Sequence, residues 1–111
     1  MYAKGDLRQM YLCFAEYRIL PEWREHYLTT TKELLLQDHE VYLYEGTDQE
    51  NLFVEVWQAS SLEQAEQIKK ERCSERSSWF QLSDWIAGGP AKLHVWTFKP
   101  AHSRGGSSIN G

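Results

Sequence analysis

The sequence predicts a single α+β domain of order βαββαβ, in which a four-stranded antiparallel sheet carries both helices on one face. Three observations predict this class. Four short runs of aromatic and aliphatic residues alternate with two amphipathic segments, and clusters of turn residues separate them. The chain of 111 residues is also long enough for one hydrophobic core but not for two.

The first half of the chain predicts a strand, a helix and a hairpin. Residues 10–18 form a short, aromatic and largely uncharged run, which indicates a buried strand. Pro21 has the fixed φ angle that suits a first helical turn, and residues 21–36 carry an apolar stripe on one helical face. Residues 41–45 and 52–59 then read as two strands joined by a polar loop, which predicts a hairpin.

The second half predicts a helix in two pieces and a final strand. Ser60 and Glu63 form a capping-box pattern, which predicts that a helix begins there. A second helical piece is expected over 78–87, before a Gly-Gly-Pro stop, and residues 92–99 alternate as the last strand. The expected organisation is a polar segment at 1–9, one domain at 10–100 and a flexible tail at 101–111.

Charge and cysteine content limit the partners and cofactors. The formal net charge is −4 and no basic stripe is present, so no nucleic-acid partner is expected. Cys13 and Cys73 have no His or Cys at metal-ligand spacing, which predicts two reduced thiols and no metal site. The chain has no run of about 18 apolar residues and no apolar leader, so we expect a cytoplasmic protein without a membrane span.

The pairing of the hairpin strands decides which side chains share a face of the sheet. If the loop is centred on Asp48 and Gln49, Glu45 lies opposite Leu52. One face then collects Val41, Leu43, Leu52, Val54 and Val56, and the other collects Tyr42, Tyr44, Phe53, Glu55 and Trp57. Both faces are rich in apolar or aromatic side chains, but two helices cover only one of them. We therefore expect a homodimer that buries the other face.

The order of elements, the segment 53–66 (FVEVWQASSLEQAE) and the aromatic residues on both faces resemble the dimeric α/β-barrel superfamily, especially its antibiotic-biosynthesis-monooxygenase-like (ABM) branch. The resemblance spans about residues 10–99. It implies a ferredoxin-like fold in which two sheets pack face to face as a barrel.

Within that superfamily, residues 15–18 resemble the first strand of the haem-degrading monooxygenases, which have Asn where Tyr17 stands here. Trp57 matches the Trp at the end of their third strand. Those enzymes bind haem through a His on the second helix, but residues 60–88 contain no His. The resemblance thus implies that Tyr17 and Trp57 face the cleft between sheet and helices, and we predict no haem or other cofactor.

The candidate site combines an acid–base pair with an aromatic box. Glu55 is a carboxylate inside an apolar strand, and a carboxylate is rarely buried there unless it has a partner or a function. A Glu55–His94 pair could transfer a proton in catalysis. The candidate ligand-binding residues are Tyr17, Trp23, Tyr42, Tyr44, Trp57, Trp79 and Trp96. Taken one at a time, these aromatic residues are more often core residues than ligand contacts.

Two functions follow from this site. The first is a cofactor-independent monooxygenase-like enzyme that acts on a small aromatic or enolisable molecule, as the resemblance implies. The second is a non-catalytic dimeric ligand-binding or regulatory module whose cleft is filled by its own aromatic side chains. A polar-lined cavity of roughly 300 Å³ or more beside Glu55 would favour an enzyme or ligand binder. If Glu55 is only structural, Glu55→Gln should keep or raise stability.

Overall fold

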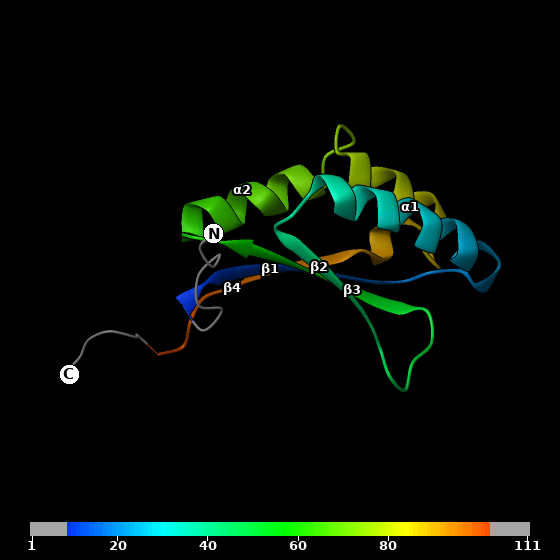
Figure 1. Cartoon of the computed structure of the whole chain (residues 1–111), viewed down its shortest axis with the longest axis horizontal. Coiled ribbons are helices and arrows are strands. Elements are labelled where there is room, and N and C mark those ends of the chain that lie inside the picture. The colour runs from blue at the N-terminus through cyan, green and yellow to red at the C-terminus, as the bar shows by residue number, and fades with distance from the viewer. Residues whose placement is uncertain (1–8, 103–111) are drawn as a thin grey trace.

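A computed structural model describes residues 9–102 of the chain. It confirms the predicted order of elements, with both α-helices over one face of the sheet (Figure 1). The elements are β1 (Tyr11–Arg18), α1 (Arg24–Gln37), β2 (Val41–Glu45), β3 (Leu52–Ala59), α2 (Leu62–Arg72) and β4 (His94–Phe98). They are accompanied by the short 3₁₀ segments η2 (Pro21–Trp23), η3 (Ser78–Trp85) and η4 (Pro90–Lys92). The segments predicted at 1–9 and 101–111 lie almost entirely outside the described residues.

The four strands form one sheet in the order β2-β3-β1-β4, and every neighbouring pair is antiparallel. Each helix therefore connects two parallel strands that have a third strand between them. This is the ferredoxin-like arrangement that the element order predicts.

Both helices begin near the predicted positions. A 3₁₀ turn at Pro21 precedes α1, which buries Tyr27, Thr31 and Leu34 at the spacing of one helical face. Helix α2 is capped by Ser61, whose hydroxyl accepts a hydrogen bond from the backbone N–H of Gln64. The predicted cap at Ser60 and Glu63 is wrong by one residue. The Gln64 side chain accepts a hydrogen bond from the backbone N–H of Ser60, the residue before the cap.

The predicted helix at 78–87 is a 3₁₀ segment, η3. It buries Trp79 and Leu82, which are three residues apart and thus lie on the same side of a 3₁₀ turn. Eight residues are too few to stabilise an isolated α-helix, so tertiary contacts decide the local geometry. The contacts here are backbone hydrogen bonds to the end of β1, from Leu20 N–H to the Trp85 carbonyl and from Ala87 N–H to the Arg18 carbonyl.

The predicted hairpin register is wrong by one residue. Glu45 lies opposite Phe53 instead of Leu52, and Gly46 donates its backbone N–H to the Leu52 carbonyl. The extra residue is accommodated at Asn51, which has a left-handed φ of 72° at the end of the loop. Since side chains alternate between the two faces of a strand, this shift moves every β2 side chain to the opposite face from the one predicted.

The corrected register sorts the sheet into two faces. The helix-covered face holds Cys13, Ala15, Tyr17, Val41, Leu43, Phe53, Glu55, Trp57, Val95 and Thr97. The other, which we call the open face, holds Leu12, Phe14, Tyr42, Tyr44, Leu52, Val54, Val56, His94, Trp96 and Phe98, together with Glu16, Arg18 and Gln58. Between 43 and 61% of the surface of Tyr42, Tyr44, Trp96 and Phe98 is exposed. The expectation that one apolar face is left without helices is thus confirmed.

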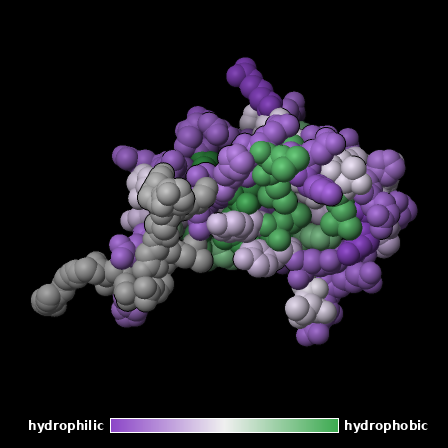
Figure 2. Space-filling view, in the orientation of Figure 1, coloured by the Kyte–Doolittle hydropathy of each residue, from purple (hydrophilic) through white to green (hydrophobic). Residues whose placement is uncertain are grey.

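Hydrophobic side chains also reach the surface along α1 and over the β2 edge of the sheet (Figure 2). Leu28, Leu35 and Leu43 are half-buried against the core there, while Leu36 is 71% exposed. Within residues 9–102, no helix is long and apolar enough to cross a membrane. Both cysteines are free, with Cys13 buried under the helices and Cys73 exposed after α2.

Candidate functional site

A hydrogen-bonded ion pair lies at the centre of the helix-covered face. The Glu55 carboxylate is fully buried and binds the guanidinium of Arg72, at 2.7 Å to Nε and 2.8 Å to Nη2. It also accepts hydrogen bonds from the Tyr17 hydroxyl, at 2.6 Å, and from the Trp57 indole N–H, at 2.9 Å. A carboxylate has about four lone-pair positions, so these four donors occupy all of them.

Arg72 is the central residue of this network that the sequence analysis did not identify. It is 2% exposed, and its guanidinium lies between the rings of Tyr17 and Trp79, with Cζ 5.9 Å from each ring centroid. Burial alone would lower the pKa of the guanidinium, but hydrogen bonding and attraction to Glu55 outweigh it and raise that pKa. Its spacing in the sequence could have indicated this position. Arg72 lies seven residues after Ala65 and four after Ile68, which places all three on the inner face of α2.

A chain of two tyrosines extends the network into α1. Because the single O–H of Tyr17 donates to Glu55, the 2.7 Å contact between the two hydroxyls must be donated by Tyr27. Burial, and then the negative charge of Glu55, raise the pKa of Tyr17 well above its ordinary value. Burial also raises the pKa of Tyr27. Both phenols are thus held in the protonated form.

We expect Tyr17 and Tyr27 to remain protonated in the folded protein when exposed tyrosines ionise. Their folded-state pKa values lie above the unfolded value of about 10, so their stabilising contribution is present below about pH 10 and is lost as the pH rises further. A spectrophotometric titration of tyrosinate, followed together with circular dichroism, should show a late phase that coincides with unfolding. Tyr17→Phe should reduce this late phase. Complete titration of all tyrosines in a folded protein would contradict the expectation.

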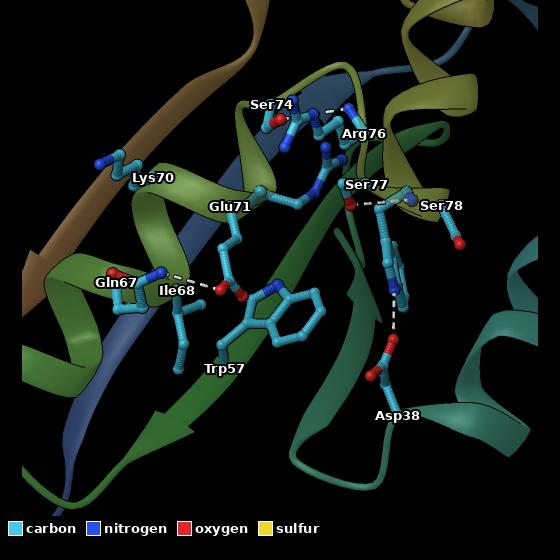
Figure 3. A pocket seen from close by; sticks show the side chains of 12 residues that line it. Asp38, Trp57, Gln67, Ile68, Lys70, Glu71, Ser74, Arg76, Ser77 and Ser78 are labelled. Atoms are coloured by element: carbon cyan, nitrogen blue, oxygen red, sulfur yellow. Dashed lines mark hydrogen bonds between the residues drawn. The ribbon is translucent and has the colours of Figure 1, made fainter.

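A cavity of about 520 Å³ opens beside this network, between the C-terminal half of α2, the loop that follows it and the start of η3 (Figure 3). Trp57 and Trp79 form an aromatic corner in it, with ring centroids 5.2 Å apart at 69°. The Trp79 indole N–H is held by Asp38 at 2.8 Å. The full lining is Asp38, Trp57, Gln67, Ile68, Lys70, Glu71, Arg72, Ser74, Arg76, Ser77, Ser78 and Trp79.

The structure brings together only some of the predicted site residues. Tyr17 and Glu55 lie in the buried network, and Trp57 and Trp79 line the cavity. Trp23 lies outside it, 37% exposed and stacked on Trp85 at 5.8 Å. The placement of Tyr42, Tyr44, His94 and Trp96 beside Glu55 is wrong, because all four lie on the open face. The physical reason is the register shift for β2, and for β4 the pairing with β1, which sets His94 opposite Glu16.

The test between a ligand-binding cavity and a filled core beside Glu55 therefore gives a mixed result. The volume directly around Glu55 is filled by Arg72, Tyr17 and Trp57, as in a closed core. The cavity starts on the other side of Arg72 and Trp57 and exceeds the size that favours a ligand-binding protein. Within residues 9–102, no group of three or more His, Cys, Asp or Glu side chains is placed to hold a metal ion.

Fold and site together define a ferredoxin-like α+β domain with an aromatic cavity next to the helix-covered face. No family model and no curated protein matches the chain. Among solved structures, the "Putative antibiotic biosynthesis monooxygenase" of Nitrosomonas europaea is similar with a TM-score of 0.65 and 16% identity, over 95% of this chain and 100% of that one. A NIPSNAP family protein of Agrobacterium tumefaciens has a TM-score of 0.60 and 15% identity, over 89% of this chain and 92% of that one. The resemblance to the ABM-like branch is thus confirmed for the fold.

Proposed function

We propose that the protein is a homodimer that binds a small aromatic molecule in the cavity between α2, the loop at 73–77 and η3. The observation that carries this proposal is the cavity of about 520 Å³ with the Trp57–Trp79 corner. Ligand pockets are commonly of this size and combine aromatic walls with a few polar groups. The cytoplasm is the compartment we propose, since both thiols are free.

The ion pair beneath the cavity supports a positioning role for Glu55. Its carboxylate holds the Trp57 indole N–H directly, and it holds Arg72, whose guanidinium packs against the Trp79 ring. Both walls of the aromatic corner are therefore fixed before a ligand arrives, which lowers the entropic cost of binding. In this role Glu55 acts through the tryptophans and does not touch the ligand.

The homodimer is supported by the open face. Its aromatic and aliphatic side chains form a continuous apolar surface across all four strands, which a single chain leaves in contact with water. A second copy of the same face offers complementary side chains and a two-fold symmetric contact. The cavity lies on the opposite side of the sheet, so it would stay open in such a dimer.

The test of the binding function uses 2-naphthol, a flat aromatic probe that is neutral at pH 7. We expect calorimetric titration to show saturable binding to the wild type, and Ser78→Trp to abolish it because an indole at this exposed rim position fills the cavity. Thr47→Trp adds the same side chain at the exposed hairpin loop and should bind as the wild type does. Equal binding by both variants would exclude this cavity as the site.

A second candidate function is a cofactor-independent oxygenase reaction in the same cavity, favoured by the fold shared with the Nitrosomonas protein. In such a reaction a substrate CH₂ group becomes a carbonyl, while O₂ supplies the carbonyl oxygen and leaves its second atom as water. The substrate provides all four electrons, so no cofactor is needed. The catalytic roles of Glu55 and His94 stay predictions within this candidate, with the two residues on opposite faces of the sheet.

Oxygen uptake with 2-tetralone, an aromatic ketone with an acidic CH₂ group, distinguishes the two candidates. Uptake by the wild type that is lost in Ser78→Trp but kept in Thr47→Trp would establish the reaction in this cavity. Binding of aromatic probes without any uptake would favour the non-catalytic function.

A further inference from the structure

One rim of the cavity, formed by the loop after α2, presents hydrogen-bond donors. The Ser74 hydroxyl oxygen accepts from the backbone N–H of Arg76, and the Ser77 hydroxyl oxygen accepts from that of Trp79, both at 3.1 Å. Each oxygen is thus an acceptor in these bonds, so each hydroxyl hydrogen is still available to a ligand. Ser78, the next residue after Ser77, also lines the cavity (Figure 3).

Arg76 adds a permanent positive charge to this rim. Its side chain is exposed, lines the cavity and lies beside Ser74 in Figure 3. The structure records no acceptor for its guanidinium among the described residues. A guanidinium with free N–H groups matches the planar geometry of a carboxylate.

Arg72, the buried cation of the cavity lining, has one N–H group without a hydrogen-bond partner, which is an independent observation. Arg72 uses Nε and Nη2 on Glu55, and because the guanidinium is a planar fork, Nη1 must point away from that carboxylate. Nη1 is buried and has no hydrogen-bond partner, although Arg72 lines the cavity. A buried donor without a partner is energetically unfavourable, and native proteins rarely keep one without a task.

The opposite side of the cavity has a different character. Trp57 and Ile68 present apolar surface there, and the Glu71 carboxylate accepts a hydrogen bond from Gln67 at 2.8 Å (Figure 3). The other acidic residue of the lining, Asp38, accepts from the Trp79 indole. Both carboxylates are thus engaged away from the serine rim. The serine hydroxyls and Arg76 lie on the loop after α2 and at the start of η3, while Trp57 and Ile68 supply apolar walls and Lys70 adds a further cation on α2.

We infer that the ligand is a flat aromatic carboxylate, with its ring against Trp57 and Trp79 and its acidic group at the rim of Ser74, Ser77, Ser78 and Arg76. This inference rests on the proposed function, whose ligand class it narrows. The unpartnered Nη1 group of Arg72 belongs to the lining of the same cavity.

The test compares 2-naphthoate with 2-naphthamide, which have the same ring and differ in charge. Calorimetric titration of the full chain at pH 7 should give about tenfold tighter binding for the naphthoate, since charge-assisted hydrogen bonds exceed neutral ones by this order. Arg76→Gln should weaken naphthoate binding about tenfold and leave naphthamide binding unchanged. Lys32→Gln removes the same charge from the exposed side of α1 and should change neither. Added salt should weaken only the naphthoate.

The outcomes separate this inference from the proposed function. If the wild type binds both probes with equal affinity and Ser78→Trp binds neither, the inference of an acidic ligand is overturned. The proposed binding of an aromatic molecule in this cavity would still hold. A naphthoate preference that survives Arg76→Gln would overturn the assigned rim. Absence of binding by both probes and by 2-naphthol would overturn the inference and the function together.

Discussion

Glu55→Gln should lower the free energy of unfolding by about 3–5 kcal/mol, because it removes one partner of a buried ion pair. The substitution keeps the shape of the side chain but leaves the Arg72 cation buried without a counter-charge. For a purely structural Glu55, sequence analysis predicted that stability should hold or rise, because the substitution removes an expensive buried charge. The finding that reverses the expectation is the bidentate contact with Arg72.

Urea denaturation at fixed protein concentration measures this effect, with unchanged m-values as the check that the transition remains two-state. Arg72→Met should be destabilising by a similar amount, because it leaves the carboxylate unpaired. The variant with both Glu55→Gln and Arg72→Met should lose less free energy of unfolding than the two single losses added together. A double-mutant cycle measures this difference.

The control is a second Arg–Glu pair. Glu45→Gln removes the same charge from the pair with Arg24, in which both side chains are 27% exposed, and should cost about 1 kcal/mol or less. Similar losses for Glu45→Gln and Glu55→Gln would show that burial does not set the strength of the central pair.

Trp96→Arg should convert the dimer that we propose into a monomer at micromolar concentration. Trp96 is 45% exposed on the open face, so a single chain loses little packing, whereas a dimer would have to bury two like charges in an apolar contact. We expect the dimer dissociation constant to rise at least about 30-fold, which corresponds to ~2 kcal/mol at an interface hot spot. Sedimentation equilibrium over a concentration series measures this change.

Leu36→Arg is the matched control for the dimer contact. Leu36 is 71% exposed on α1, on the helix side of the sheet, so an arginine there should leave the dimer unchanged. A wild-type protein that sediments as a monomer would contradict the proposed dimer directly. If Leu36→Arg dissociates the dimer and Trp96→Arg does not, the interface lies on the helix side of the sheet.

The sequence by itself determined the order of elements and most of their limits. The bounds of β2 and β3 were predicted to the residue, and β1 and α1 to within a few residues. These elements are encoded locally, in runs of apolar residues, in the Pro21 turn and in polar loops. Glu55 was also recognised from sequence, because a carboxylate inside an apolar strand is unusual in any register.

The tertiary structure decided which residues meet. A shift of one residue in the hairpin register moved Tyr42 and Tyr44 to the open face, because strand side chains alternate between the two faces. The sequence of the loop alone did not determine this register. The partner of Glu55 came from the last residue of α2, 17 residues further along the chain. Its position depends on how the helix is rotated and packed over the sheet, which no local pattern specifies. The cavity was beyond sequence analysis for the same reason, since its walls come from β3, α2 and η3 and adjoin one another only when those elements are packed together.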